Sequence, residues 1–351
     1  MHNESSHINI DPDFDYSIFE ESNESSQEVT GEQLLSEEVK EMDYLIQNLL
    51  PRTGIAALAG ASDTGKSMLL RYLSICLVAG VESFLGFLFN TVHRSCIYVS
   101  SEDGREATSF LLQRQASQYL PAVLQKLRFI FDYEDLLEKL DSSLTAKPAD
   151  LIIIDCFSDV FGGDLKDTQK IRTFLNPYQK LSEKHKCFIL FLHHTGKRTE
   201  NFEPSKNNLL SGQGFEAKMR LVIELRADLM NPTQRHLCIV KGNYLPARFK
   251  KESFVLDFDE QNFTFSNTGD RTPFELLVKQ PEGDNSRTKY EQAKALKEHG
   301  HSYEKIAQMI GYGSKGSVSK LFDKAEKNGW DTDVSSPVSN GNKGNDNGND
   351  L

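Results

Sequence analysis

One eight-residue segment, Gly60-Ala-Ser-Asp-Thr-Gly-Lys-Ser67, constrains the fold more than any other part of this chain. It follows the apolar run Gly54–Ala59 and opens a stretch with helical periodicity, Ser67–Val78. Two glycines, a lysine and a serine at this spacing, between a strand and a helix, are typical of a loop that binds nucleotide phosphates. The glycines let backbone N–H groups turn toward the phosphates, and the start of the helix adds positive potential.

The segment therefore predicts a site for ATP and Mg²⁺. Lys66 is expected to reach the β- and γ-phosphates, and the Ser67 hydroxyl is expected to bind Mg²⁺. The predicted nucleotide-binding residues are Gly60, Ala61, Ser62, Asp63, Thr64, Gly65, Lys66, Ser67 and Met68.

Short apolar runs alternate with helical stretches over most of the chain, which predicts an α/β fold with a largely parallel sheet. Several runs lack the alternation of a half-exposed strand, so they suit central strands that are covered on both faces. The expected strands are Gly54–Ala59, Cys96–Ser100, Leu127–Phe131, Leu151–Ile154, Cys187–Leu192, Leu221–Leu225 and Leu237–Val240. The expected helices between the first strands are Ser67–Val78, Arg105–Gln118 and Thr168–His185.

Acidic residues follow two of these strands, where ligands of open α/β sheets bind. Asp155 ends the run Leu151-Ile-Ile-Ile-Asp155 and is the predicted second ligand of Mg²⁺. A Glu directly after this Asp is common in AAA+ proteins, but here the next residue is Cys156. Glu102 and Asp103 end the strand that follows the phosphate loop and its helix, an arrangement of the RecA type. Glu102 is thus the predicted base for the attacking water, with Asp103 as its helper.

A histidine pair, His193-His194, ends the run that begins at Cys187. A polar side chain at this strand end can contact the γ-phosphate and transmit its loss to the following loop. Adjacent residues of a strand point to opposite faces, so the two histidines are not expected to bind one metal ion. His194 is the preferred γ-phosphate sensor of the two.

The succession of these motifs, together with Val240-Lys-Gly-Asn-Tyr-Leu-Pro246, resembles the plasmid RepA-type hexameric replicative helicases over about residues 45–265. The resemblance implies a RecA-like P-loop core and a homo-hexameric ring with ATP bound between subunits. It also implies that a basic residue of the neighbouring subunit completes each site. Arg220 and Lys241 occupy the matching positions, and either could supply that cation or form a structural ion pair instead.

Two segments are candidates for DNA contact. The polar stretch 195–214 carries Lys197, Arg198 and Lys206 directly after the predicted sensor. In RecA-like rings a loop at this place faces the channel, where single-stranded DNA would bind; a mobile surface loop is the alternative. The second segment, residues 286–332, holds nine Lys or Arg against five Asp or Glu between residues 286 and 328.

The second segment predicts three helices, Thr288–Glu298, Ser302–Ile310 and Ser317–Lys327, with Ser302 as an N-cap. Their spacing resembles a helix-turn-helix, which would bind duplex DNA. A protein-interaction module is the alternative. The expected DNA contacts are Lys315, Ser317, Ser319 and Lys320, and the expected core is Ala295, Ile306, Ala307, Ile310, Val318 and Leu321.

Charge and composition divide the chain further. The net charge is −11, but residues 1–44 alone carry thirteen acidic residues and one Lys, so the remainder sums to about +1 and is not biased against DNA. Residues 1–38 and 333–351 are predicted to be disordered. The ATPase domain is expected at 39–280, a linker at 281–285 and the helix-turn-helix domain at 286–332.

No long apolar run or basic, hydrophobic N-terminal signal is present, and the five cysteines are scattered, which together predict a cytoplasmic protein without a membrane span. The sequence thus predicts a Mg-ATP-hydrolysing, DNA-acting ring ATPase, a helicase or loader in replication, mobilisation or recombination. The alternative is a DNA-binding regulator that ATP switches with little turnover.

Overall fold

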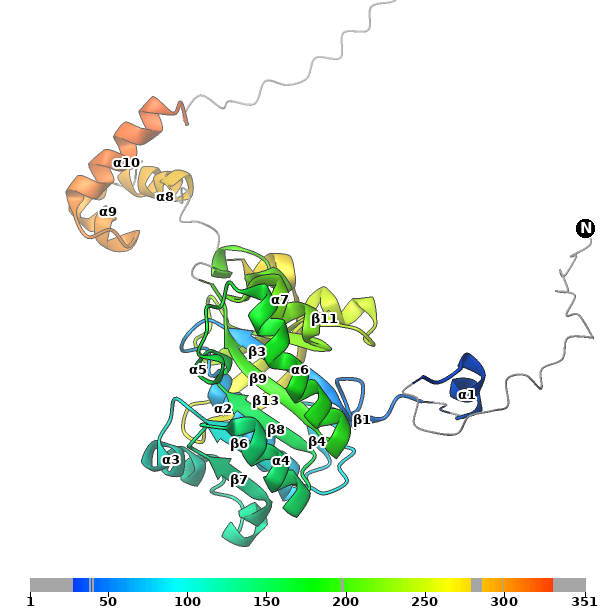
Figure 1. The fold of residues 1–351 in the computed structure, drawn as a ribbon. Coiled ribbons are helices and arrows are strands. Elements are labelled where there is room, and N and C mark those ends of the chain that lie inside the picture. The colour runs from blue at the N-terminus through cyan, green and yellow to red at the C-terminus, as the bar shows by residue number, and fades with distance from the viewer. Residues whose placement is uncertain are drawn as a thin grey trace, which may run out of the picture.

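The computed structural model describes residues 28–37, 39, 41–196, 199–278, 286–298 and 300–330. Its centre is a nine-stranded sheet (Figure 1). Six neighbouring strands run parallel, from β10 to β7, and β11, β12 and β13 extend the sheet as antiparallel strands. In spatial order the strands are β13 (Thr264–Pro273), β12 (Glu252–Asp259), β11 (Gln234–Gly242), β10 (Leu221–Ala227), β3 (Gly54–Gly60), β9 (Phe188–His194), β8 (Leu151–Asp155), β6 (Cys96–Ser100) and β7 (Leu127–Ile130).

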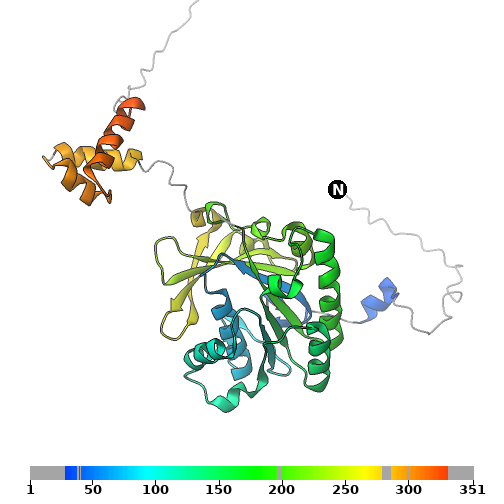
Figure 2. The same cartoon turned by 60° about the vertical axis from the view of Figure 1, so that its left-hand side comes forward.

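Helices cover both faces of this sheet, and in the turned view α2 (blue) and α6 (green) lie on opposite sides of the strands (Figure 2). Alternate residues of β3 supply the two cores: Ala56 and Leu58 face α2, whereas Ile55, Ala57 and Ala59 face α6 and α7. The helices of this part of the chain are α1 (Gly31–Ser36), α2 (Lys66–Ala79), α3 (Arg105–Gln115), α4 (Leu136–Ala146), α5 (Phe157–Phe161), α6 (Thr168–His185) and α7 (Gly212–Lys218).

Several short elements connect these layers. Two small antiparallel hairpins pair β1 with β2 and β4 with β5. Their bounds are Tyr44–Ile46, Leu50–Pro51, Ser83–Phe84 and Phe87–Leu88, and the 3₁₀ segments are Pro121–Lys126, Thr199–Asn201, Lys206–Asn208, Ala247–Lys250 and Phe274–Leu277.

The predicted α/β class and all seven predicted strands are confirmed, with ends that differ by at most three residues. The hairpin of β12 and β13 was not predicted. Its strands mix Phe and Val with many polar residues, because one part of the hairpin packs on α2 while the rest is exposed. Within the segment predicted to be disordered, residues 31–36 form α1, which a reciprocal capping box between Thr30 and Gln33 stabilises.

Residues 286–330 form three helices with a core of their own, α8 (Ser286–Glu298), α9 (Tyr303–Met309) and α10 (Lys315–Lys327). Ser302 caps α9, as predicted, by accepting a hydrogen bond from the backbone N–H of Lys305. The prediction that Ala295 lies in this core is wrong: it is exposed. Tyr290 and Ala293 face the core instead, because the apolar face of α8 follows their three-residue spacing.

Some predicted features lie outside the described residues, namely the acidic segment 1–27, the linker 281–285 and the C-terminal segment from 331. Among the described residues, no helix is long and apolar enough to cross a membrane.

Candidate active site

The segment Gly60–Ser67 forms a tight turn between the end of β3 and the start of α2. Gly65 has a φ of +87°, which favours glycine, and a Cβ atom on Gly60 would lie 2.5 Å from the carbonyl oxygen of Leu225. Gly65 is the N-cap of α2 and offers no side chain, so the first N–H groups of the helix remain available for an anion. The backbone thus has the form required for phosphate binding.

Lys66 lies within this turn and is only 6 % exposed. Its Nζ donates a hydrogen bond to the carbonyl oxygen of Ala61 at 2.6 Å. Burial lowers the pKa of Lys66, while the negative charges of Asp155, Glu102 and Asp63 partly oppose that shift. A buried ammonium group at the helix start, beside three carboxylates, is suited to neutralise phosphate charge.

Asp155, at the end of β8, faces the start of α2. Tyr98 of β6 donates a hydrogen bond of 2.6 Å to Asp155 Oδ2. The other oxygen, Oδ1, is buried and accepts no hydrogen bond from the described residues, although the Ser67 side chain lies near enough to lower the pKa of the carboxyl. Burial is the larger influence, and it raises that pKa. One unpaired, buried carboxylate oxygen beside a serine hydroxyl fits a hard cation such as Mg²⁺.

The neighbour of Glu102 has a different part in this region from the helper role predicted for it. Asp103 accepts a hydrogen bond of 3.0 Å from Nη2 of Arg71, which is only 1 % exposed. The Arg71 guanidinium lies 5.8 Å from the centre of the Tyr98 ring. Asp103 therefore compensates the buried charge of Arg71 beneath Tyr98, and Tyr98 in turn holds Asp155.

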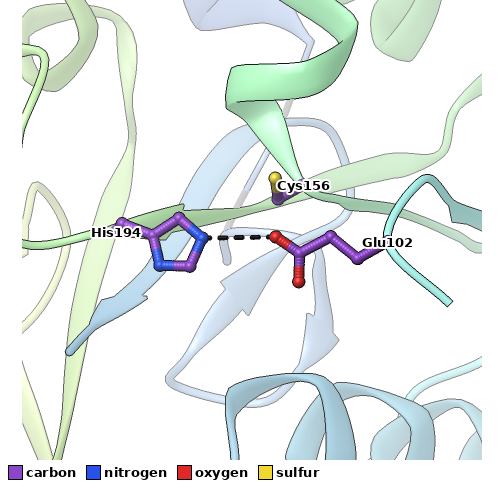
Figure 3. Close-up of side chains that lie close together, drawn as sticks. All are labelled: Glu102, Cys156 and His194. Atoms are coloured by element: carbon purple, nitrogen blue, oxygen red, sulfur yellow. Dashed lines mark hydrogen bonds and ion pairs between the residues drawn. The ribbon is translucent and has the colours of Figure 1, made fainter. Parts of the chain in front are cut away.

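Glu102 and His194 face each other across the site, with 3.4 Å between Glu102 Oε1 and His194 Nε2 (Figure 3). They follow or end β6 and β9, and Cys156 follows β8, the strand between those two. Glu102 is largely exposed, so its carboxylate can reach a water molecule that lies in front of the phosphate loop. The structure thus brings together Lys66, Glu102, Asp155 and His194, as the sequence predicted.

The two histidines at the end of β9 have different surroundings. His193 is fully buried, packs against Phe157 and Phe215, and forms a 2.7 Å hydrogen bond with Ser211 Oγ. Burial lowers the pKa of His193 to about 3, so it is neutral at physiological pH. Only His194 faces Glu102, which supports its choice as the sensor.

The unpredicted antiparallel strands supply one wall of the site. Arg235 of β11 is 9 % exposed and donates a hydrogen bond of 3.1 Å from Nε to the carbonyl oxygen of Thr64. Its guanidinium also lies 5.1 Å from the ring centre of Phe258 on β12. Sequence reasoning missed both residues, because neither belongs to a motif and each reaches the loop only through strand pairing. They line a cavity of about 540 Å³ together with Ser62, Asp63, Gly65, Lys66, Ser67, Met68, Glu102, Leu192 and His194.

Arg220 and Lys241 lie away from the phosphate loop of their own chain. The backbone N–H of Arg220 bonds to the carbonyl of Ile55, five residues before Gly60, or about 17 Å along the strand at 3.3 Å per residue. Lys241 pairs with Val222, the strand partner of Ala57. The Lys241 Nζ lies 3.0 Å from Glu216 Oε1 and donates to the Glu216 carbonyl oxygen at 2.7 Å.

The segment that follows His194 is anchored rather than loose. Leu210 donates to the His194 carbonyl, and the buried Arg226 donates to the carbonyls of Thr199 and Phe202. Lys206 lies 3.1 Å from Glu216, so Lys206 and Lys241 share one carboxylate. The other two basic residues predicted for DNA here, Lys197 and Arg198, lie outside the described residues.

The predicted DNA-contacting residues of the three-helix unit lie in the first two turns of α10. Lys315, Ser319 and Lys320 are exposed, whereas Ser317 is half-buried and close to the Ser314 hydroxyl. The helix begins at Lys315, two residues earlier than predicted, because Ser314 is its N-cap.

The phosphate turn, its buried lysine and the acidic strand ends define the class of protein: this is a P-loop enzyme that hydrolyses ATP. The family assignment agrees, because a family profile described as "AAA domain" matches residues 20–200. That match covers more than half of the chain, and the chain belongs to this family.

Other comparisons support the fold. The solved ATPase domain of a replicative helicase aligns with a TM-score of 0.51 and 11 % sequence identity, over 67 % of this chain and 95 % of that one. At this identity the likeness shows a shared RecA-like fold. No curated protein sequence matches the chain significantly.

Proposed function

We propose that this protein is a Mg-ATP-dependent ring ATPase that acts on DNA, as a helicase or loader of the RepA type. The observation that carries the proposal is the separation of Arg220 and Lys241 from the phosphate loop of the same chain. Two cations that match a family motif, yet lie at the far edge of the sheet, fit a site that a neighbouring copy completes.

In this proposal each group of the site has one task in hydrolysis. Lys66 binds the β- and γ-phosphates, and Glu102 accepts a proton from the water that attacks the γ-phosphate. Ser67 and Asp155 Oδ1 hold Mg²⁺, which neutralises charge on the phosphate oxygens when it is bound. His194 contacts the γ-phosphate, and Arg220 or Lys241 of the next subunit approaches it from the other side.

Release of the γ-phosphate would be communicated to DNA through the segment after β9. His193 and His194 are both bonded to this segment, at Ser211 and Leu210. A shift of His194 therefore moves a loop that carries basic residues, which supports single-stranded DNA in a central channel as the partner. The exposed Lys315 and Lys320 support duplex DNA as the partner of the three-helix unit.

The deciding experiment measures ATP turnover with and without single-stranded DNA. We expect DNA to stimulate turnover, because loop movement and hydrolysis are coupled in a motor. Glu102→Gln should abolish turnover in both conditions and retain ATP binding, since the amide cannot accept the proton but keeps the shape of the side chain. If single-stranded DNA gives neither stimulation nor strand displacement, the motor proposal fails.

A second candidate is a DNA-binding regulator in which ATP sets the oligomeric state. The self-contained core of residues 286–330 favours it, because such a unit can bind DNA without the ATPase. In that case Glu102→Gln would leave DNA binding and its response to ATP intact.

A further inference from the structure

Three side chains at the active site are of types that bind transition metals. Glu102, Cys156 and His194 each offer one ligand atom, and these atoms all lie within 4.8 Å of one another. Figure 3 shows the Cys156 sulfur beside the contact between Glu102 and His194. The strands that supply them, β6, β8 and β9, are direct neighbours in the sheet, so the scaffold holds the three atoms together.

The chemistry of this set differs from that of the magnesium site. Mg²⁺ takes oxygen ligands, whereas a thiolate and an imidazole favour borderline or soft cations such as Zn²⁺. We propose that Glu102, Cys156 and His194 form a binding site for Zn²⁺ or a similar cation, separate from Ser67 and Asp155. Water would complete a four-coordinate arrangement.

The geometry requires little rearrangement. Bond lengths of about 2.0–2.3 Å place the ligand atoms of a tetrahedral zinc site about 3.3–3.6 Å apart. Glu102 Oε1 and His194 Nε2 are already 3.4 Å apart. The sulfur must approach them by about 1 Å or less, and the Glu102 side chain is exposed enough to supply that movement. The cation can enter from the open side, where Glu102 and His194 lie.

Two features limit the affinity. Burial raises the pKa of the Cys156 thiol to about 12, so the metal must displace a proton that is firmly held. The charge of Lys66 also lies close to Glu102 and Cys156 and repels a cation. Both features favour a reversible, inhibitory site over a permanent structural one.

Binding would remove Glu102 and His194 from the hydrolytic reaction, so the cation would inhibit turnover. This consequence rests on the roles given to both residues in the proposed function, whereas binding itself depends on the geometry alone. The two are therefore measured separately.

The experiment titrates the nucleotide-free full chain with Co²⁺, a spectroscopic substitute for Zn²⁺. We expect a thiolate-to-cobalt charge-transfer band and four-coordinate d–d bands, which Zn²⁺ abolishes by competition. Cys156→Ser should remove the charge-transfer band. Glu102→Gln and His194→Ala should weaken Co²⁺ binding roughly tenfold or more.

Cys76→Ala is the matched control, because Cys76 is also a buried thiol but belongs to no such cluster among the described residues. It should leave the spectrum unchanged. Retained binding of an ATP analogue shows that each variant is folded. A wild-type protein without the charge-transfer band, or a band that survives in Cys156→Ser, overturns the proposed site.

Turnover is then measured against Zn²⁺ for the wild type, Cys76→Ala and Cys156→Ser, each relative to its own zinc-free rate. We expect half-inhibition of the first two at a zinc concentration at least about tenfold below that for Cys156→Ser. Cobalt bands without zinc inhibition would support the metal site and contradict the hydrolytic roles of Glu102 and His194.

Discussion

At the scale of single residues, Tyr98 is the clearest addition to the predicted site. Its hydroxyl occupies Asp155 Oδ2 and leaves Oδ1 directed at the cation. A carboxylate that is oriented by a neighbouring donor binds a metal more tightly than one that is free to rotate. Tyr98 is thus a positioning residue for the magnesium site, held in place by Arg71.

We predict that Tyr98→Phe raises the Mg²⁺ concentration needed for half-maximal turnover about tenfold, because the ring is kept and only the hydrogen bond to Asp155 is lost. The measurement is the ATPase rate against Mg²⁺ at saturating ATP. Tyr72→Phe removes another partly buried hydroxyl that does not touch Asp155, and it should leave the magnesium dependence unchanged. Equal curves for Tyr98→Phe and the wild type would refute the positioning role.

His193 provides a second prediction, on the stability of the fold. Its pKa falls from the ordinary 6.5 to about 3 in the folded protein. Between these values the unfolded chain binds the proton and the folded chain does not, so the free energy of unfolding falls as the pH falls. The slope from this one group reaches at most about 1.4 kcal/mol per pH unit.

We therefore expect urea denaturation at pH 7, 6 and 5 to show a smaller loss of stability for His193→Gln than for the wild type. His194→Gln, which alters the neighbouring and less buried ring, should retain the full loss. A wild-type slope that persists in His193→Gln would show that this histidine is not buried in its neutral form.

At the scale of elements, the antiparallel strands β11 to β13 complete the nucleotide site. Arg235 bonds to the phosphate loop, Gln115 bonds to the carbonyls of Met68 and Phe263, and Phe265 lies against Gly65. The loop is therefore supported from two directions, by its own strand and helix and by this extension of the sheet.

We predict that Arg235→Gln raises KM for ATP about tenfold with a smaller change in kcat. The lost hydrogen bond from a charged donor is worth about 1.5–3 kcal/mol and supports the loop in the ground and transition states alike. Steady-state kinetics provide the test. Arg271→Gln, on β13 but packed on Phe254 and Phe249, is the control and should keep the wild-type KM. A change confined to kcat would contradict this explanation.

These strands also show where sequence reasoning succeeds and fails. The strands β3, β6, β8 and β9 were predictable because each is a continuous apolar run that is buried on both faces. Their polar ends identify Lys66, Glu102, Asp155 and His194, since parallel strands bring their ends to one edge. Arg235, Phe258 and the bond from Tyr98 to Asp155 depend on strand order and register, which a single sequence does not encode locally.

At the scale of the whole molecule, the arrangement of charges argues for a site that two copies share. The phosphate loop lies at the carboxyl ends of the parallel strands, while Arg220 lies near their amino ends. Lys241 is held by Glu216, which also holds Lys206 of the loop after β9. Glu216 thus joins a DNA-binding candidate to a candidate for the shared site, through contacts within one chain.

The arrangement leads to a prediction for mixtures of two inactive variants. Lys66→Ala lacks a working phosphate loop but retains Arg220, and Arg220→Ala has the opposite defect. If the arginine acts across subunits, random mixed rings contain complete sites at about a quarter of their interfaces, and turnover recovers to a comparable fraction. The measurement is the ATPase rate of each variant alone and of an equimolar mixture after subunit exchange. A mixture of Lys66→Ala with Glu102→Gln is the control and should stay inactive, because both changes affect the same half of the site. An equimolar mixture of Lys66→Ala and Arg220→Ala that gains no activity, although the copies exchange, would place Arg220 outside the shared site.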